Sequence, residues 1–283
     1  MAKPRALVLT GYGINCDWET AFAFEKAGAE ARRVHVNDLI DGHDSLDRYQ
    51  ILSFPGGFSY GDDISSGKVL ANRVKTHLAE AIRRFIEKGG LVIGICNGFQ
   101  VVVKYGLLGS PEGPIEEQRS TLTNNDSSRY EDRWVHLRPE DGRCIFTRGL
   151  DKLYLPVAHG EGKFFTDPQT LEGLEAAGCV VLRYADEEGR AAGGRFPWNP
   201  NGSLNDIAGI CDPSGRVFGL MPHPERHLHF TQHPLWTRIA EEYRREGRPL
   251  PEEGDGMALF RNAVTYFTDS ESLYRRGKGK GKR

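Results

Sequence analysis

The stretch LVIGICNGFQVVVKY, residues 91–105, carries a cysteine between a strand and a helix. LVIGI has the continuous apolar character of a buried strand, and FQVVVKYGLL continues with the pattern of a helix. The spacing of Gly94, Cys96 and Gly98 is typical of a nucleophile elbow, a tight turn that lifts a reactive side chain above the edge of a sheet. The amides and dipole at a helix N-terminus favour thiolate over thiol. The stretch therefore predicts that Cys96 is a nucleophile. The alternative is a cysteine that only packs in the turn.

The N-terminal third of the chain alternates strand and helix patterns. Apolar strand patterns occupy residues 6–10, 31–36, 49–54 and 91–95, and helix patterns occupy residues 17–28 and 68–90. We expect Asp17 to be the N-cap of the first helix and Gly28 to end it. This alternation predicts an α/β fold with a mostly parallel central sheet and helices on both faces. Sites in such sheets lie at the carboxyl ends of the strands.

Beyond residue 115 the pattern changes to short apolar runs separated by polar loops. The runs are WVHL (134–137), LYLPVAH (153–159), CVVLRYA (179–185), IAGIC (207–211) and VFGLM (217–221). They predict a smaller, more antiparallel, strand-rich part. No linker interrupts the chain, so we expect one domain over residues 1–270, with a polar insert at 231–254 that contains one helix. Residues 275–283, RRGKGKGKR, predict a basic flexible tail over 271–283, which is solvated or contacts an anion.

Composition and missing motifs exclude several functional classes. The 283 residues include 37 basic and 39 acidic side chains, a net charge of −2, which gives no reason to expect nucleic acid or a membrane as partner. Five cysteines without a CxxC pair argue against disulfides and against a zinc or other metal site. Residues 11–16 lack the third glycine of a dinucleotide fingerprint, and no phosphate-binding loop is present, so we expect no cofactor on this chain. Without a secretory signal or a long apolar span, a cytoplasmic location is expected.

The segment VFGLMPHPERH offers a base for the thiol. His223 and Glu225 are two residues apart, so in an extended segment they project the same way, and the carboxylate can hold one imidazole nitrogen while the other faces Cys96. The alternative is a surface His and Glu in a Pro-rich turn. PGGFSYGDD, residues 55–63, follows a strand that ends at the same sheet edge. Its glycine amides, with the amide of Asn97, are candidate donors to an oxyanion, although such a glycine pair is often only a turn.

Five motifs in a fixed order carry a family resemblance: PGGFSYGD, GICNGFQ, AHGEG, NPNGS and MPHPER. Together with GINCD (13–17), they resemble the glutaminase subunits of phosphoribosylformylglycinamidine synthase, a group of triad-type class I glutamine amidotransferases with a flavodoxin-like fold. The resemblance covers most of residues 5–227 and resumes in GDGMALF. Phe58, Ser59 and Tyr60, which follow the glycines of PGG, and Asn97 and Phe99, which follow Cys96, resemble this group more than the glutaminases of anthranilate, GMP, CTP or carbamoyl phosphate synthesis.

The resemblance implies a glutaminase reaction in de novo purine biosynthesis. Cys96 would attack the side-chain amide of glutamine, His223 would protonate the leaving ammonia, and water would hydrolyse the glutamyl thioester, with Glu225 as the third triad member. The ammonia would pass to a large synthetase subunit that converts formylglycinamide ribonucleotide to formylglycinamidine ribonucleotide. That partner would hold the ATP and Mg, and a small accessory subunit would complete the complex.

Further residue roles follow from the same resemblance. Gly57 and Asn97 would stabilise the oxyanion, and Gln100, Gly56 and Phe58 would bind the substrate. His159 and Glu161 are either near the site or partner surface, or a structural pair at a strand end. Cys16 has no obvious base beside it, so we interpret it as packing next to the Asp17 cap.

Two other functional classes are alternatives to the resemblance, and some segments of the chain depart from the family pattern. An α/β-hydrolase with a thiol would carry its acid before its histidine, whereas His223 precedes Glu225. A binding module derived from an amidotransferase would be expected to lack a triad member. The remaining alternative is another class I amidotransferase. The insert at 231–254 and the tail are longer than expected for compact members of the group, and TNNDSSRYEDRWV matches only loosely.

Overall fold

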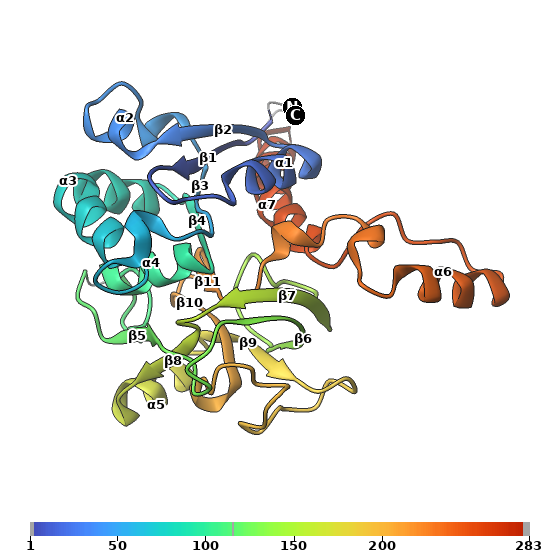
Figure 1. The fold of residues 1–283 in the computed structure, drawn as a ribbon. Coiled ribbons are helices and arrows are strands. Elements are labelled where there is room, and N and C mark those ends of the chain that lie inside the picture. Colours follow the sequence, from blue (N-terminus) through green and yellow to red (C-terminus); the bar gives the residue numbers. More distant parts are fainter. Residues whose placement is uncertain (1–2, 115, 280–283) are drawn as a thin grey trace.

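The computed structural model describes residues 3–114 and 116–279. Nine strands within these residues form one sheet, in the order β2-β1-β3-β4-β11-β10-β9-β6-β7 (Figure 1). A two-stranded antiparallel sheet, β5 (Ser120–Thr123) with β8 (Lys163–Thr166), lies beside it. The predicted α/β class with a mostly parallel central sheet is confirmed.

The parallel half carries the four strands expected in the N-terminal third. They are β1 (Arg5–Thr10), β2 (Glu30–His35), β3 (Ile51–Phe54) and β4 (Leu91–Ile95), and β11 (Val217–Leu220) pairs parallel to β4. VFGLM therefore returns from the C-terminal part of the chain to the parallel half. As a result, the segment that follows β11 emerges at the same sheet edge as the segment that follows β4.

The antiparallel half extends the same sheet. It consists of β6 (Glu131–Pro139), β7 (Leu153–His159), β9 (Val180–Ala185) and β10 (Ile207–Cys211). Each successive pair from β11 to β7 is antiparallel, so β7 runs in the same direction as β4. The end of β7, at His159, thus lies on the edge that also receives the ends of β3, β4 and β11.

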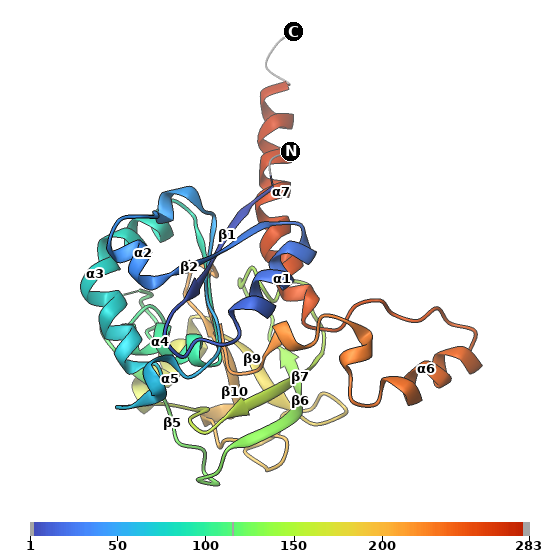
Figure 2. The same cartoon turned by 45° about the horizontal axis from the view of Figure 1, so that its top comes forward.

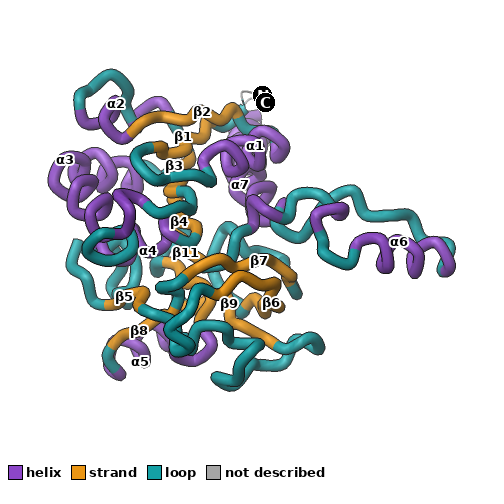
Figure 3. Tube along the Cα trace, in the orientation of Figure 1, coloured by secondary structure: helices purple, strands orange, loops and turns teal. Residues whose placement is uncertain are grey.

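Helices cover both faces of the parallel half (Figures 1 and 3). The helix α1 (Asp17–Ala27) packs with α7 (Met257–Gly279) on one face, where Phe24 and Phe260 meet edge to face at 5.0 Å. On the other face lie α3 (Lys68–Glu87) and α4 (Asn97–Tyr105). Shorter helices are α2 (Val36–Ile40), α5 (Pro168–Ala176), η1 (Leu46–Arg48), η2 (Ser59–Asp62), η3 (Leu204–Asp206), η4 (Pro224–Arg226) and η5 (Phe230–Gln232).

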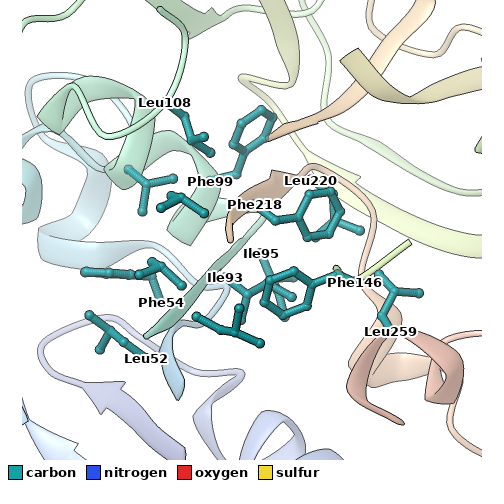
Figure 4. Packing of buried hydrophobic residues seen from close by; sticks show 14 of the residues in the cluster. Leu52, Phe54, Ile93, Ile95, Phe99, Leu108, Phe146, Phe218, Leu220 and Leu259 are labelled. Carbon is teal, nitrogen blue, oxygen red and sulfur yellow. The ribbon is translucent and has the colours of Figure 1, made fainter. Parts of the chain in front are cut away.

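The core under the elbow joins α4 to β11. Phe99, on the first turn of α4, is fully buried and lies over Gly219 of β11, where an added Cβ would overlap its ring. Phe218 stacks on Phe146 at 5.4 Å, and Ile93 lies among them (Figure 4). Burial of these apolar side chains holds the strand before Cys96 and the strand before His223 in fixed register.

Two expectations at helix ends differ from the structure. Cys16, not Asp17, is the N-cap of α1, since its carbonyl accepts the first helical bond from Thr20 at 3.1 Å. The Asp17 carboxylate instead accepts a hydrogen bond from Arg33 at 2.8 Å. The last helix, α7, runs to Gly279 and so includes residues 271–279 of the predicted flexible tail. Residues 280–283 of the predicted tail lie outside the described residues, so the tail stays a prediction.

The insert forms an arm that projects from the body (Figure 2). Its predicted helix is present as α6 (Trp236–Arg245). No helix within the described part of the chain is long and apolar enough to cross a membrane.

Candidate active site

Cys96 occupies a strained turn between β4 and α4. Its φ and ψ are 51° and −106°, a conformation that non-glycine residues rarely adopt. An added Cβ at Gly98 would overlap the carbonyl oxygen of Phe54, and one at Gly94 would lie 2.6 Å from the oxygen of Gly98. The flanking glycines therefore let three backbone segments approach closely. This is the geometry of the predicted elbow, and it puts Cys96 at the N-terminus of α4.

His223 and Glu225 form a buried pair at the end of β11. The imidazole Nδ1 lies 2.6 Å from Glu225 Oε1, and each side chain is no more than 1% exposed. Burial alone would lower the pKa of His223, but the charges of Glu225 and Cys96 raise it well above its ordinary value. With Nδ1–H directed at the carboxylate, Nε2 has no hydrogen-bond partner among the described residues. The arrangement favours the charged form of His223 beside Cys96.

Cys16 also belongs to this cluster, which corrects the interpretation of it as packing beside a cap with no base nearby. Its Sγ, a nitrogen of His223 and a carboxylate oxygen of Glu225 all lie within 4.8 Å of one another. Arg226 Nη2 donates a hydrogen bond to the same Sγ at 3.1 Å. These three are the only group in the described part of the chain with donor atoms close enough to hold a metal ion. The guanidinium beside the sulfur opposes a cation there.

The glycine loop, residues 55–63, follows β3 and lies next to the elbow, where Ser59 N donates to Asn97 Oδ1. Gly57 has φ 148°, and an added Cβ would lie 2.5 Å from the Gly13 oxygen, so only glycine fits without strain. Its amide has no acceptor among the described residues, and neither does the amide of Asn97, which as the first residue of α4 has no intrahelical acceptor. Both backbone donors predicted for the oxyanion are thus free.

Gly56 lies directly against the catalytic imidazole. An added Cβ there would be 2.8 Å from Cε1 of His223 and 3.3 Å from Sγ of Cys16. The absence of a side chain at this position lets the ring and the thiol come together. Gly56 was predicted to bind substrate, and its contact in this structure is with the base.

The Asn97 side chain fixes the glycine loop to α4. Its Oδ1 accepts from Ser59 N at 3.1 Å, and its Nδ2 donates to Asp62 Oδ1 at 3.1 Å and to Gln100 Oε1 at 3.0 Å. Gln100 in turn donates to the carbonyl of Glu161 at 2.6 Å. Gln100, predicted to bind substrate, therefore braces the loop that follows β7. Direct contact with a substrate would require it to exchange one of these bonds.

Glu161 and the buried Lys104 complete this brace. The Glu161 carboxylate accepts from Ser66 N at 3.1 Å and lies 3.5 Å from Lys104 Nζ, which also donates to Ser66 O at 2.6 Å. Burial lowers the pKa of Lys104, and the charge of Glu161 opposes that shift. Sequence reasoning missed Lys104, although its position four residues after Gln100 places both on one face of α4.

His159 lies beneath the site and is 2% exposed. Its Nδ1 is 3.1 Å from Asn125 Oδ1, and Asn201 Nδ2 is 3.5 Å from its Nε2. Burial, with the neighbouring charge of His223, lowers the pKa of His159 to about 4. A neutral ring enclosed in this way offers no surface to a partner. Of the two interpretations of His159, its contacts therefore support the one of a structural residue at a strand end.

Known proteins match this chain along nearly its whole length. A family model for the CobB/CobQ-like glutamine amidotransferase domain matches residues 3–267. Phosphoribosylformylglycinamidine synthase subunit PurQ of Methanococcus maripaludis is 48% identical over 265 residues, which are 93% of this chain and 97% of that protein. The subunit PurQ of Dehalococcoides mccartyi is 49% identical over 268 residues, or 94% and 98% of the two chains.

The chain belongs to the PurQ family. A chain in the solved structure of PurLQS from Thermotoga maritima matches it with a TM-score of 0.68 and 32% identity, covering 94% of this chain and 99% of that one. PurQ is a glutamine amidotransferase subunit of phosphoribosylformylglycinamidine synthase, an enzyme of purine biosynthesis. The family and activity inferred from the sequence are therefore confirmed.

Exposed apolar side chains lie on the glycine loop after β3 and on the segments beside it. Phe58 and Tyr130 lie with ring centroids 6.4 Å apart, and Tyr12 contacts Tyr60 at 5.8 Å. Burial is the main cause that raises the pKa of Tyr130. The charge of Cys96 raises it further, and the charge of His223 opposes the shift. Together with Ile64, the exposed members Tyr12, Phe58 and Tyr130 form what we call the aromatic rim. Phe58, predicted to bind substrate, lies on this rim.

Proposed function

We propose that this chain hydrolyses glutamine to glutamate and ammonia through a thioester on Cys96. The observation that carries the proposal is the meeting of a strained elbow cysteine with a buried His223–Glu225 pair whose second imidazole nitrogen is unpartnered. A thiolate is the reactive form of cysteine, and an adjacent imidazolium stabilises it.

The reaction has two halves. The Cys96 thiolate attacks the side-chain amide carbon of glutamine, and the resulting tetrahedral intermediate collapses when His223 gives its proton to the departing nitrogen. This step breaks the C–N bond, releases ammonia and leaves a γ-glutamyl thioester. His223 then takes a proton from water as the water attacks the thioester carbon. Glutamate leaves, and the thiolate and imidazolium are restored.

Each remaining residue has a role in this scheme. The free amides of Gly57 and Asn97 donate to the oxyanion in both halves, and loss of one such donor typically lowers kcat by about 10²- to 10³-fold. Glu225 holds the tautomer and stabilises the imidazolium. Phe58 and Gly56 border the place of the substrate chain, and Gln100 keeps the elbow and the loop after β7 in register.

The ammonia has its destination in a partner. The related solved structure is that of PurLQS from Thermotoga maritima. By analogy, this chain assembles with a large synthetase subunit that receives the ammonia and a small accessory subunit. ATP and Mg bind the synthetase, and this chain holds no cofactor. The aromatic rim is the docking face, because its member Tyr130 lies near Cys96 and His223 and the rim exposes apolar surface that a partner would cover.

The test compares two nitrogen sources in the assembled synthase. Glutamate production from glutamine should be slow for the chain alone and rise when the synthetase and its ligands are added, because docking stabilises the competent site. Cys96→Ala should abolish product formation with glutamine and leave formation with added ammonium unchanged. Full activity of the free chain would exclude activation by the synthetase. Loss of the ammonium-driven reaction in an intact complex would exclude the proposal that this chain supplies ammonia and the synthetase uses it.

A further inference from the structure

Cys16 and Arg226 lie against the catalytic pair, yet the acyl transfer described above uses neither. Cys16 is 1% exposed and directly precedes α1, and Arg226 is half-buried in η4, one residue after Glu225. The Cys16 sulfur accepts a hydrogen bond from Arg226 Nη2 at 3.1 Å, and its S–H is directed to Asn15 Oδ1 at 3.3 Å. The Cys16 side chain therefore has both a donor and an acceptor partner.

The backbone fixes where this thiol lies. Cys16 N donates to the carbonyl of Gly56 at 3.2 Å, and Ile14 forms an antiparallel bridge with Gly57. The GINCD segment thus runs along the glycine loop that carries an oxyanion donor. Since Gly56 offers no side chain, the thiol and the edge of the His223 ring share the space beside it. The sulfur therefore lies beside the ring, within 4.8 Å of both a ring nitrogen and a Glu225 carboxylate oxygen.

The groups around His223 come from several elements. The charged and titratable residues that face it are Cys16, Cys96, Tyr130, His159, Glu225 and Arg226. Arg226 keeps its charge beside the pair, since a guanidinium is not deprotonated in proteins. Among the described residues, the His223 ring has its hydrogen bond at Nδ1 and none at Nε2, and a ring held at one atom can pivot about that bond. The contact with Cys16 limits that pivot.

We propose that Cys16 and Arg226 form a positioning pair for the catalytic imidazole, in which the thiol bridges the guanidinium and the ring and keeps Nε2 directed at Cys96. This inference rests on the proposed function, since it assigns Cys16 a role through His223. It predicts that loss of the thiol weakens the thiolate–imidazolium pair without changing how glutamine binds.

The test uses the full chain and three variants. Cys16→Ala removes the thiol, Cys16→Ser keeps a smaller donor and acceptor, and Cys179→Ala removes a buried cysteine outside the site as a control. The first readout is the rate at which iodoacetamide alkylates Cys96 as a function of pH, followed on the peptide that contains GICNGFQ. The second is kcat and KM for glutamine in the assembled synthase.

We expect Cys16→Ala to slow Cys96 alkylation about tenfold at neutral pH and to leave the rate unchanged in strongly alkaline solution, where the thiol does not need the imidazole to react. Its kcat should fall about tenfold while KM stays within about twofold, because the imidazole acts on the transition state. Cys16→Ser should retain part of the effect, and Cys179→Ala should match the wild type.

Two negative results have different meanings. If Cys16→Ala shows the wild-type alkylation profile and kcat, the positioning pair is wrong, while Cys96 remains the nucleophile. If Cys96 of the wild type is no more reactive than Cys179 at neutral pH, the proposed function itself fails. Where Cys16→Ala does not fold, Cys16→Ser and Arg226→Gln decide the question by the same two readouts.

Discussion

At the scale of single residues, the site depends on one strained backbone and one buried ion pair. The positive φ of Cys96 costs on the order of 1–3 kcal/mol, which the surrounding packing must offset. This backbone conformation places the thiol at the N-terminus of α4, just beyond the end of β4. The charge of Glu225 then keeps His223 protonated in spite of its burial.

His223 and Glu225 should differ in how severely their loss impairs glutaminase activity. His223→Ala removes proton transfer, worth about 10²- to 10⁴-fold. Glu225→Gln leaves an imidazole but removes the charge that raises its pKa, so the alkaline limb of the kcat profile, set by loss of the imidazolium, should move to lower pH. Rates over pH in the assembled synthase check both points. A folded, inactive Glu225→Gln beside a normally active His223→Ala would reverse the assigned roles.

At the scale of elements, the elbow requires glycine at two positions. A Cβ at Gly98 would overlap the Phe54 carbonyl, so Gly98→Ala must move β3 or α4. We expect it to lower the free energy of unfolding by about 2–4 kcal/mol, measured by chemical denaturation. Gly142→Ala is the matched control, because a Cβ there meets Val181 only at 3.5 Å. Equal stability of the two variants would contradict the close packing of the elbow.

The loop after β7 should be sensitive to acid through His159. Its pKa of about 4 lies below the ordinary value of 6.5, so the unfolded chain binds a proton that the folded chain excludes. His159 therefore does not affect the free energy of unfolding above pH 6.5, and it lowers that free energy as the pH falls from 6.5 to 4. The full effect is about 3 kcal/mol. His159→Gln should weaken the pH dependence of unfolding over that window, whereas exposed His77→Gln should not.

The sequence predicted most strands and helices because their periodicity and end signals are local. It also placed Cys96, His223 and Glu225, since their spacing implies the chemistry. It failed where contacts are distant in sequence. Cys16 meets Arg226 across 210 positions, and Lys104 meets Glu161 across 57, so neither contact leaves a local pattern. The family resemblance of GINCD was a signal at Cys16, but we interpreted that cysteine as packing beside the Asp17 cap.

At the scale of the whole molecule, the aromatic rim and the projecting arm are separate exposed surfaces. Ile64 on the rim is 73% exposed, and Leu250 on the arm is 53% exposed. If the synthetase docks on the rim, Ile64→Asp should weaken activation of glutamine hydrolysis by the synthetase, because docking would bury a charge. Leu250→Asp should leave that activation unchanged. Titrating each variant with synthetase measures the effect, and the opposite order would move the docking face to the arm.

The most direct test of the account is covalent labelling of the full chain, assembled with its synthetase, by a glutamine analogue that carries an electrophile at the amide carbon. Peptide mass analysis should find one label per chain, on the peptide containing GICNGFQ, and none in Cys96→Ala. The Cys16→Ala chain should reach the same final stoichiometry more slowly. Full labelling that persists in Cys96→Ala, or that maps to Cys16, would contradict the central claim that Cys96 is the acylated nucleophile.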